Sequence, residues 1–363
     1  MGDVTHQTHS HHQLAHEAPH PSPQQAPRDP APRDQDAHQL GVSLGPVLCK
    51  QCDDRLGPIE WFRCSWQHGG AATGFAVWRD ETTETPVMVK LPVGSREHRW
   101  TTSIAALHAG SNVGPDSGTD AGPTPRVLAA GTELNGYDLA WLVVERLSGK
   151  PLSSALTAEA VHDLLDAAAR FHAAALRASP NLRPADEPPQ AHDWDGLLAK
   201  SREMVKDSGL TEARHWKEAV KRVQRALPRL KAKWAARKID TWCHGDLHPA
   251  NVLRRASKSS ASPCVLIDLA MVHSGHWVED AVYLERLYWG RPELLHGVKP
   301  VSHLAKIRRE MGVATDDNYA ELAAVRRVLM AGCVPAYATF EGHPKYTHAA
   351  LETLEQYLPQ VAH

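Results

Sequence analysis

The sequence lacks the features that direct a chain to a membrane, to nucleic acid or to an oxidising compartment. No apolar run approaches the roughly 18 residues that span a bilayer, and no basic region followed by an apolar stretch predicts a secretion signal. The formal net charge is -2, without the basic excess of nucleic-acid binders. The six cysteines are scattered, as in proteins of a reducing cytoplasm. We therefore expect a cytoplasmic protein with no membrane and no nucleic acid as partner; the sequence does not indicate its oligomeric state.

Large apolar side chains are also scarce at the N-terminus. Residues 1–40 are rich in His, Pro, Gln and Asp, and such a segment cannot bury enough surface to offset the entropy lost on ordering. We predict a disordered tail there. The chain as a whole is 42% apolar and 23% charged, the composition of an ordinary globular protein, and its length is sufficient to bury a core.

Beyond the tail, the pattern predicts strands mostly in the first half and helices mostly in the second. Short apolar or alternating runs indicate strands, and longer spans with apolar residues three and four apart indicate helices. The predicted strands are 59–66, 74–78, 86–91, 126–130, 139–145, 241–243 and 264–267. The predicted helices are 95–108, with Ser95 as its cap, 157–178, 211–239, 318–330 and 347–358. This order predicts an α+β fold.

The most informative motif lies between two short strands in the helical half. His244-Gly-Asp-Leu-His-Pro-Ala-Asn251 places an aspartate in a tight turn after a strand and an asparagine five residues later. A second carboxylate, Asp268, follows the next strand. Phosphoryl transfer needs one carboxylate to orient the attacking hydroxyl and separate oxygen ligands to hold magnesium against the phosphates. Asp246 is placed for the first task, and Asn251 and Asp268 are placed for the second.

These residues resemble the aminoglycoside phosphotransferase-like small-molecule kinases, a family that includes choline, homoserine and fructosamine kinases. The motif His-Gly-Asp-x-His-x-x-Asn is complete, and the resemblance spans roughly residues 59–283. It includes Val87-Met-Val-Lys90, Arg96-Glu97, Val144-Glu-Arg-Leu-Ser-Gly149 and Ile267-Asp268. The resemblance implies a two-lobed, protein-kinase-like fold. A small antiparallel sheet would form a nucleotide-binding N-lobe over residues 41–145, and a mostly helical C-lobe would occupy residues 146–363.

The resemblance implies a nucleotide site in the N-lobe and at the hinge. Lys90 would hold the α- and β-phosphates of ATP or GTP, and Glu97 would pair with it. Backbone groups from Glu145 to Leu147 would bind the base. The phosphate turn would contain Gly69 and Gly70, although the sequence there is not a clean GxGxxG.

The resemblance assigns the chemistry to the C-lobe. Asp246 would be the catalytic base, and Asn251 and Asp268 would bind Mg²⁺. Asp280 would brace the catalytic loop by accepting backbone N–H bonds. His244 is expected to be a buried structural histidine rather than an acid or base.

Two features argue against a protein kinase. His248 stands where protein kinases have a lysine, and only eleven residues separate Asp268 from Asp280, too few for a peptide-docking segment. We therefore expect a small-molecule hydroxyl as acceptor, contacted by residues 181–210 and the last helices. Its identity stays open, because the basic helix near residues 217–229 opposes a group of acidic residues that would favour a cationic aminoglycoside or choline. These acidic residues are Asp193, Asp195, Glu279, Asp316 and Asp317.

Three alternatives remain at this stage. The unusual phosphate turn and the Leu-Ala pair after Asp268 would suit a nucleotide-binding pseudokinase or regulatory module without turnover. A metal-dependent hydrolase could use His244, Asp246 and His248, but it gives Lys90 and Asp268 no shared role. A structural zinc site could use Cys49, Cys52, Cys64 and His68, although the spacing fits loosely.

Overall fold

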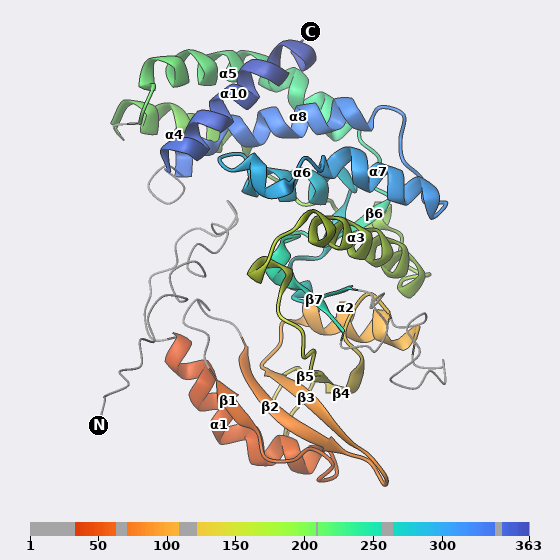
Figure 1. Ribbon diagram of the computed structural model, residues 1–363. Coiled ribbons are helices and arrows are strands. Elements are labelled where there is room, and N and C mark those ends of the chain that lie inside the picture. The colour runs from red at the N-terminus through yellow and green to blue at the C-terminus, as the bar shows by residue number, and fades with distance from the viewer. Residues whose placement is uncertain are drawn as a thin grey trace, which may run out of the picture.

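The computed structural model describes residues 33–62, 71–108, 122–207, 210–255, 264–337 and 343–362, and these form two lobes (Figure 1). The N-lobe holds a five-stranded antiparallel sheet in the order β1-β2-β3-β5-β4. Its strands are β1 (Glu60–Phe62), β2 (Ala72–Arg79), β3 (Glu84–Leu91), β4 (Val127–Gly131) and β5 (Trp141–Glu145). Two helices accompany the sheet, α1 (Arg33–Gln51) and α2 (Ser95–Ala106).

Alternation along β3 gives the two faces of this sheet different tasks. Val87, Val89 and Leu91 are fully buried in a core that also contains Leu48 of α1. Because successive side chains of a strand point to opposite faces, Lys90 lies on the other face. The sheet therefore turns a packed face to α1 and carries the predicted nucleotide lysine on the face that is not covered by α1.

Helix α1 was not expected from the sequence. It begins at Arg33, so the tail boundary predicted at residue 40 falls inside it, while residues 1–32 lie outside the described part. A Cβ atom at Gly41 would come within 2.7 Å of the Ala72 side chain, so glycine lets the helix approach the sheet closely. The segment lacks a strong apolar stripe, and tertiary packing against the sheet stabilises it.

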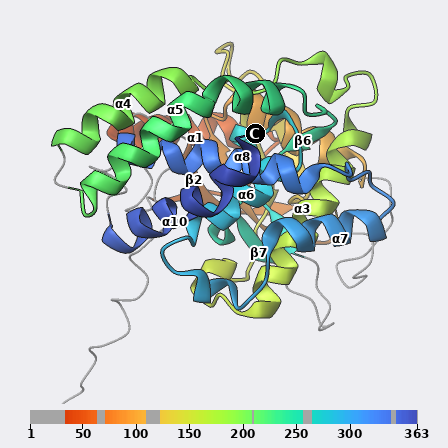
Figure 2. The ribbon, with the colours of Figure 1, turned by 90° about the horizontal axis from the view of Figure 1, so that it is seen from above.

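The C-lobe is mostly helical, as predicted. Seen from above, α4, α5, α8 and α10 form its outer layer (Figure 2). Its helices are α3 (Ala158–Ala178), α4 (Trp194–Asp207), α5 (Ala213–Ala235), α6 (Val278–Leu287), α7 (Pro300–Glu310), α8 (Tyr319–Gly332) and α10 (Pro344–Val361). Two small antiparallel ribbons pair β6 (Thr241–Cys243) with β9 (His273–Gly275) and β7 (Val252–Arg254) with β8 (Cys264–Leu266). None of the helices in the described ranges is long and apolar enough to cross a membrane.

The α+β, two-lobed prediction is confirmed, and most boundaries fall within a few residues of those expected. The cap of α2 was wrong: Gly94 precedes the helix without a side-chain bond, and Ser95 is its first residue. Thr157, by contrast, caps α3 by accepting the N–H of Ala160. Helices α4, α6 and α7 were not predicted, because their apolar patterns are short.

The longest helix of the described residues, α5, has large apolar side chains three and four positions apart, the spacing from which a helix over 211–239 was predicted. Six of these form a stripe that is buried in the C-lobe core: Trp216, Val220, Val223, Leu227, Leu230 and Trp234. The basic side chains between them are exposed, so α5 turns its basic face away from the core; they are Lys217, Lys221, Arg222, Arg225 and Lys231.

Truncation within this stripe should be costly. Trp216→Ala should lower the free energy of unfolding by about 3–5 kcal/mol, because Trp216 is fully buried and the change leaves a cavity. The matched control Lys217→Ala, at the exposed neighbouring position, should change it by less than about 0.5 kcal/mol. Urea unfolding followed by far-UV circular dichroism measures both, and equal losses in the two variants would contradict this account of the core.

Candidate active site

The loop with the His-Gly-Asp motif follows β6 and is held by one carboxylate. Asp280 Oδ2 accepts the backbone N–H of His244 at 2.7 Å, and its Oδ1 accepts the N–H of Gly245 at 2.9 Å. Gly245 has a φ of 81°, and a Cβ atom there would lie 2.3 Å from the carbonyl oxygen of Met271. Only glycine fits this turn. The contact expected of Asp280 with the loop backbone is thus present.

A buried relay behind the loop keeps Asp280 ionised. His172 Nε2 donates to Asp280 Oδ2 at 2.9 Å, because Arg308 Nη1 donates to the other ring nitrogen of His172 at 3.1 Å and leaves Nε2 with the proton. Burial would raise the pKa of Asp280, but the bond from His172 and the backbone N–H groups hold it below its ordinary value. Burial lowers the pKa of His172, so the ring is neutral. The sequence analysis did not find Arg308, which lies 136 residues from His172.

His244 is a structural residue with both ring nitrogens in use. Its Nδ1 accepts the N–H of Asp246 at 3.2 Å, and its Nε2 donates to the carbonyl oxygen of Ile267 at 3.0 Å. The ring therefore connects the catalytic turn to the segment before Asp268. Since neither nitrogen is left for a metal ion, the hydrolase alternative, which needed His244 as a ligand, is wrong.

Asp246 is ionised and oriented by three neighbours. Tyr283 Oη donates to its Oδ1 at 2.6 Å, Asn251 Nδ2 donates to its Oδ2 at 3.2 Å, and His248 Nε2 lies 3.4 Å from Oδ2. Burial would raise the pKa of Asp246, but His248 and Tyr283 outweigh it and lower the pKa to about 2. Tyr283 was not identified from the sequence, because nothing in its local pattern separates it from a core tyrosine of α6.

The structure brings the other predicted residues to the same place. Asn251 Nδ2 also donates to the carbonyl oxygen of Asp246 at 3.0 Å, so the side-chain oxygen of Asn251 is left for another ligand. The N–H of Ile267 donates to the carbonyl oxygen of Asn251 at 3.0 Å, which sets Asp268 beside it. Asp268 is exposed and makes no hydrogen bond or ion pair with the described residues.

Lys90 faces this group from the N-lobe. Its Nζ lies 2.5 Å from Glu97 Oε1, the pairing that was expected. Burial would lower the pKa of Lys90, but the carboxylates of Glu97 and Asp268 outweigh it and raise the pKa above its ordinary value. Lys90 is therefore charged, and the negative charge of Asp268 is close enough to stabilise it.

The donor set fits a hard divalent cation. Asn251 offers an amide oxygen and Asp268 offers an exposed carboxylate, and oxygen ligands of this kind suit Mg²⁺. Both residues expected to bind magnesium therefore offer oxygen atoms of the required kind, and Asp268 is also exposed.

Two of the three backbone N–H groups at the hinge are used within the N-lobe. The N–H of Glu145 donates to the carbonyl oxygen of Arg126, and the N–H of Arg146 donates to that of Pro86. In the described part of the chain, the N–H of Leu147 has no such partner. Of the three hinge N–H groups, only that of Leu147 is left to bond a nucleotide base. Gly69 and Gly70 lie outside the described residues, as do Cys64 and His68 of the zinc alternative.

Arg255, which the sequence analysis missed, ties the hinge to the C-lobe. Its Nε and Nη2 donate to Glu145 Oε1 at 2.9 and 2.6 Å, and its guanidinium also donates to the carbonyl oxygens of Gly122 and Thr124. Burial would raise the pKa of Glu145, but Arg255 and Arg126 hold it below its ordinary value. Arg255 follows β7, so one side chain connects the hinge to the ribbon that positions Asn251 and Asp268.

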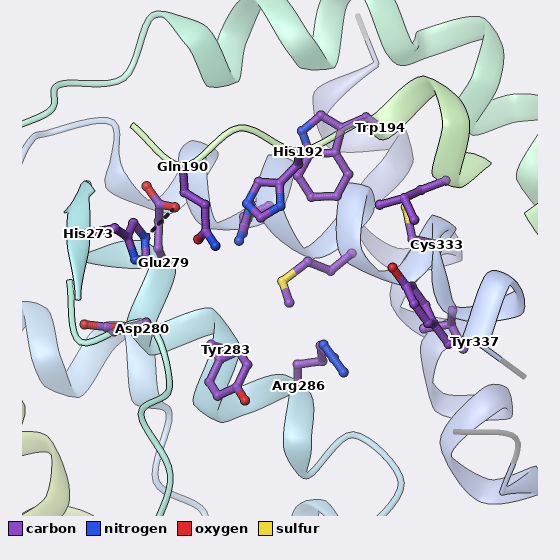
Figure 3. Close-up of a pocket in the computed structure, with 15 residues that line it drawn as sticks. Gln190, His192, Trp194, His273, Glu279, Asp280, Tyr283, Arg286, Cys333 and Tyr337 are labelled. Atoms are coloured by element: carbon purple, nitrogen blue, oxygen red, sulfur yellow. Dashed lines mark hydrogen bonds and ion pairs between the residues drawn. The ribbon is translucent and has the colours of Figure 1, made fainter. Parts of the chain in front are cut away.

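A pocket opens in the C-lobe and is lined by Gly245, which precedes Asp246, and by Tyr283, which donates to Asp246 (Figure 3). Its walls come from the segment before α4, from α6 and from the end of α8, within the regions expected to contact an acceptor. The lining includes Gln190, His192, Trp194, Tyr283, Arg286, Arg326, Met330 and Tyr337.

Only one of the five acidic residues proposed for a cationic acceptor, Glu279, lines this pocket. Asp193 accepts the N–H of Gly196, Asp195 pairs with Lys231, and Asp316 pairs with Lys238. The carboxylate of Asp193 therefore accepts a backbone N–H at the start of α4, and those of Asp195 and Asp316 form ion pairs with lysines outside the pocket.

Comparison with known proteins agrees with this geometry. Residues 69–323 match the model of the phosphotransferase enzyme family, whereas no curated protein matches the sequence. The aminoglycoside phosphotransferase from Alicyclobacillus acidocaldarius subsp. acidocaldarius DSM 446 has a TM-score of 0.52 at 16% identity, covering 93% of this chain and 96% of its own. The microcompartment-associated aminopropanol kinase has a TM-score of 0.49 at 14% identity, covering 87% and 98%. The first likeness shows the fold.

Because Asp246 is ionised in the folded protein, the free energy of unfolding should depend on pH in the acid range. Its pKa of about 2 lies below the ordinary 3.8, so the carboxylate stabilises the fold above about pH 4, by about 2 kcal/mol, and this contribution is lost as the pH falls toward 2. The difference in unfolding free energy between the wild type and Asp246→Asn should therefore shrink between about pH 5 and pH 2.5 in urea titrations. Tyr283→Phe removes a hydrogen bond that lowers the pKa of Asp246, so in this variant the stabilisation by Asp246 should be lost at a higher pH. A difference independent of pH would show that Asp246 is not held ionised by its neighbours.

Proposed function

The chain belongs to the phosphotransferase enzyme family, and from this premise we propose that it transfers the γ-phosphoryl group of ATP or GTP to a hydroxyl group of a small molecule. The observation that carries the proposal is the convergence of Asp246, Asn251 and Asp268 in the C-lobe, with Lys90 of the N-lobe close enough for the charge of Asp268 to act on it. A binding module without turnover would not need an ionised, oriented carboxylate beside an open pocket.

Asp246 acts as the base. The acceptor hydroxyl lies against its carboxylate, and the hydroxyl oxygen forms a bond to the γ-phosphorus as the bond from that phosphorus to the bridging oxygen breaks. The hydroxyl proton passes to Asp246, and ADP or GDP leaves. A carboxylate with a pKa of about 2 is a weak base, which suits a loose transition state in which the proton moves late. Tyr283 and Asn251 fix the carboxylate in the orientation that this requires.

The remaining residues hold the nucleotide. Lys90, kept charged by Glu97, binds phosphate oxygens, and the N–H of Leu147 bonds to the base. Asn251 and Asp268 would hold Mg²⁺, which when bound neutralises the charge on the phosphates. Arg255 maintains the spacing between the hinge and these ligands through Glu145.

A small acceptor is favoured by the segment between Asp268 and Asp280. It contains a 3-10 turn, Leu269–Met271, the strand β9, which pairs with β6, and the start of α6. Most of this segment is buried, and it contains no loop long enough to serve as a platform for a peptide. The pocket next to Tyr283 is the site that we assign to the acceptor.

Removal of the base should abolish transfer. Asp246→Asn should lower kcat by roughly 10²–10⁴-fold, because general-base catalysis contributes about this much, while the affinity for nucleotide changes little. Asp195→Asn, at an exposed surface ion pair, is the matched control and should retain full activity. ADP release in the presence of acceptor measures kcat, and calorimetry measures binding. Unchanged turnover in Asp246→Asn would refute the assignment.

Substitution of Asp268, the exposed residue proposed to bind Mg²⁺, should weaken ATP binding only when Mg²⁺ is present. Asp268→Asn should weaken the binding of ATP in the presence of Mg²⁺ by roughly tenfold or more, the effect of losing about 1.4 kcal/mol, and should not weaken ATP binding in EDTA. Asp317→Asn, at an exposed position outside the cleft, should leave both values unchanged. Isothermal titration calorimetry with and without Mg²⁺ separates the two effects. Equal losses in both buffers would mean that Asp268 does not hold the ion.

A further inference from the structure

One wall of the acceptor pocket carries a buried cation, Arg326, that is in no ion pair with the part of the chain that the structure describes. Arg326 of α8 is 5% exposed, and its guanidinium lies over the rings of Trp194 and Trp234, 5.3 and 5.1 Å from their centroids. Its Nε and Nη1 have no hydrogen-bond partner among the described residues, and it forms no ion pair with them. A buried charged group without hydrogen bonds costs several kcal/mol, and the aromatic contacts offset only part of this.

The nearest carboxylate is already committed to another arginine. Glu279 Oε1 accepts from Arg237 Nε at 3.1 Å and from the N–H of His276 at 3.0 Å. Burial would raise the pKa of Glu279, but His273, Arg326 and Arg237 hold it well below its ordinary value, so it carries one negative charge. The guanidinium groups of Arg237 and Arg326 thus both face the carboxylate of Glu279, and only that of Arg237 is hydrogen-bonded to it.

The same pocket reaches the reacting group. Gly245 and Tyr283 belong to its lining, and Tyr283 Oη donates to Asp246 Oδ1. In Figure 3, Tyr283 and Arg286 lie on one side of the cavity, opposite His192 and Trp194. A small molecule in this space can therefore meet Arg326 with one group and Asp246 with another.

We propose that the acceptor is an alcohol that also carries an anionic group, a carboxylate or a phosphate, and that Arg326 binds this anion while the hydroxyl faces Asp246. The inference rests on the proposed function and specifies its acceptor. It reverses the expectation that Glu279 attracts a cation, because Arg237 already neutralises that carboxylate. An aminoglycoside or choline would bring a second positive charge against a buried guanidinium.

The wild-type enzyme tests this with acceptors of different charge. Glycerate and 4-hydroxybutanoate represent carboxylates and glycerol 3-phosphate represents phosphates; glycerol is the neutral analogue, and choline and kanamycin are the cations. With ATP and Mg²⁺, kcat/KM should be at least roughly tenfold higher for an anionic acceptor than for glycerol. The anion with the higher kcat/KM identifies whether the pocket prefers a carboxylate or a phosphate. Transfer to glycerol, choline or kanamycin in preference to every anion would overturn the inference while the proposed function stands.

Binding provides a readout that does not need turnover. With the nucleotide site filled by ADP and Mg²⁺, calorimetry should detect glycerate or glycerol 3-phosphate but not choline. Absence of anion binding in this experiment would overturn the inference. Failure to bind ATP at all would instead overturn the proposed function.

Substitutions test whether Arg326 is the side chain that binds the anionic group of the acceptor. Arg326→Gln should raise KM for the anionic acceptor by roughly tenfold or more and leave KM for ATP unchanged, and Arg326→Lys should restore part of the loss. The matched control is Arg327→Gln, because Arg327 points away to Glu285, with two bonds of 2.7 Å. Equal KM values for the acceptor in Arg326→Gln and in the wild type would refute the role. Should Arg326→Gln fail to fold, the wild-type acceptor and binding measurements decide alone.

Discussion

The position of the catalytic loop depends on the carboxylate of Asp280. Its two oxygens accept the N–H groups of His244 and Gly245, and the turn that they fix presents Asp246. The carboxylate can do this only if it stays ionised while buried, which is why a neutral His172 donates to it and Arg308 donates to His172. Because a buried charge without partners is so costly, these contacts form a unit, and the loss of one would displace the loop rather than merely weaken it.

Hydrogen bonds of residues in and just after the catalytic loop also connect the two lobes. Asn251 is bonded to Asp246 on one side and, through its carbonyl oxygen, to Ile267 on the other, so the base and both proposed magnesium ligands move together. Arg255, at the end of the same ribbon, binds Glu145 in the hinge. The nucleotide side and the acceptor side of the cleft are thereby held by one short stretch of chain, residues 244–255.

Charge distribution separates the proposed nucleotide site from the proposed acceptor site. In the cleft, Lys90 is balanced by Glu97, which leaves Asp268 exposed. In the pocket, Glu279 is paired with Arg237, which leaves Arg326 without an ion pair among the described residues. The imbalance of opposite sign in the two places is consistent with a metal cation on one side of Asp246 and an anionic group on the other.

The sequence by itself determined the elements and the residues whose signal is local. The short apolar run at 86–91 predicted the strand β3, the spacing in α5 predicted a helix with one apolar side, and the His-Gly-Asp motif identified Asp246 and Asn251, because backbone geometry fixes which neighbours share a face or a turn. Tertiary structure alone decided the partners of these residues. Tyr283 lies 37 positions from Asp246, Arg255 lies 110 from Glu145, and Arg308 lies 136 from His172. No local pattern distinguishes an arginine on a helix surface from one, like Arg326, that packing buries beside a pocket without an ion pair among the described residues.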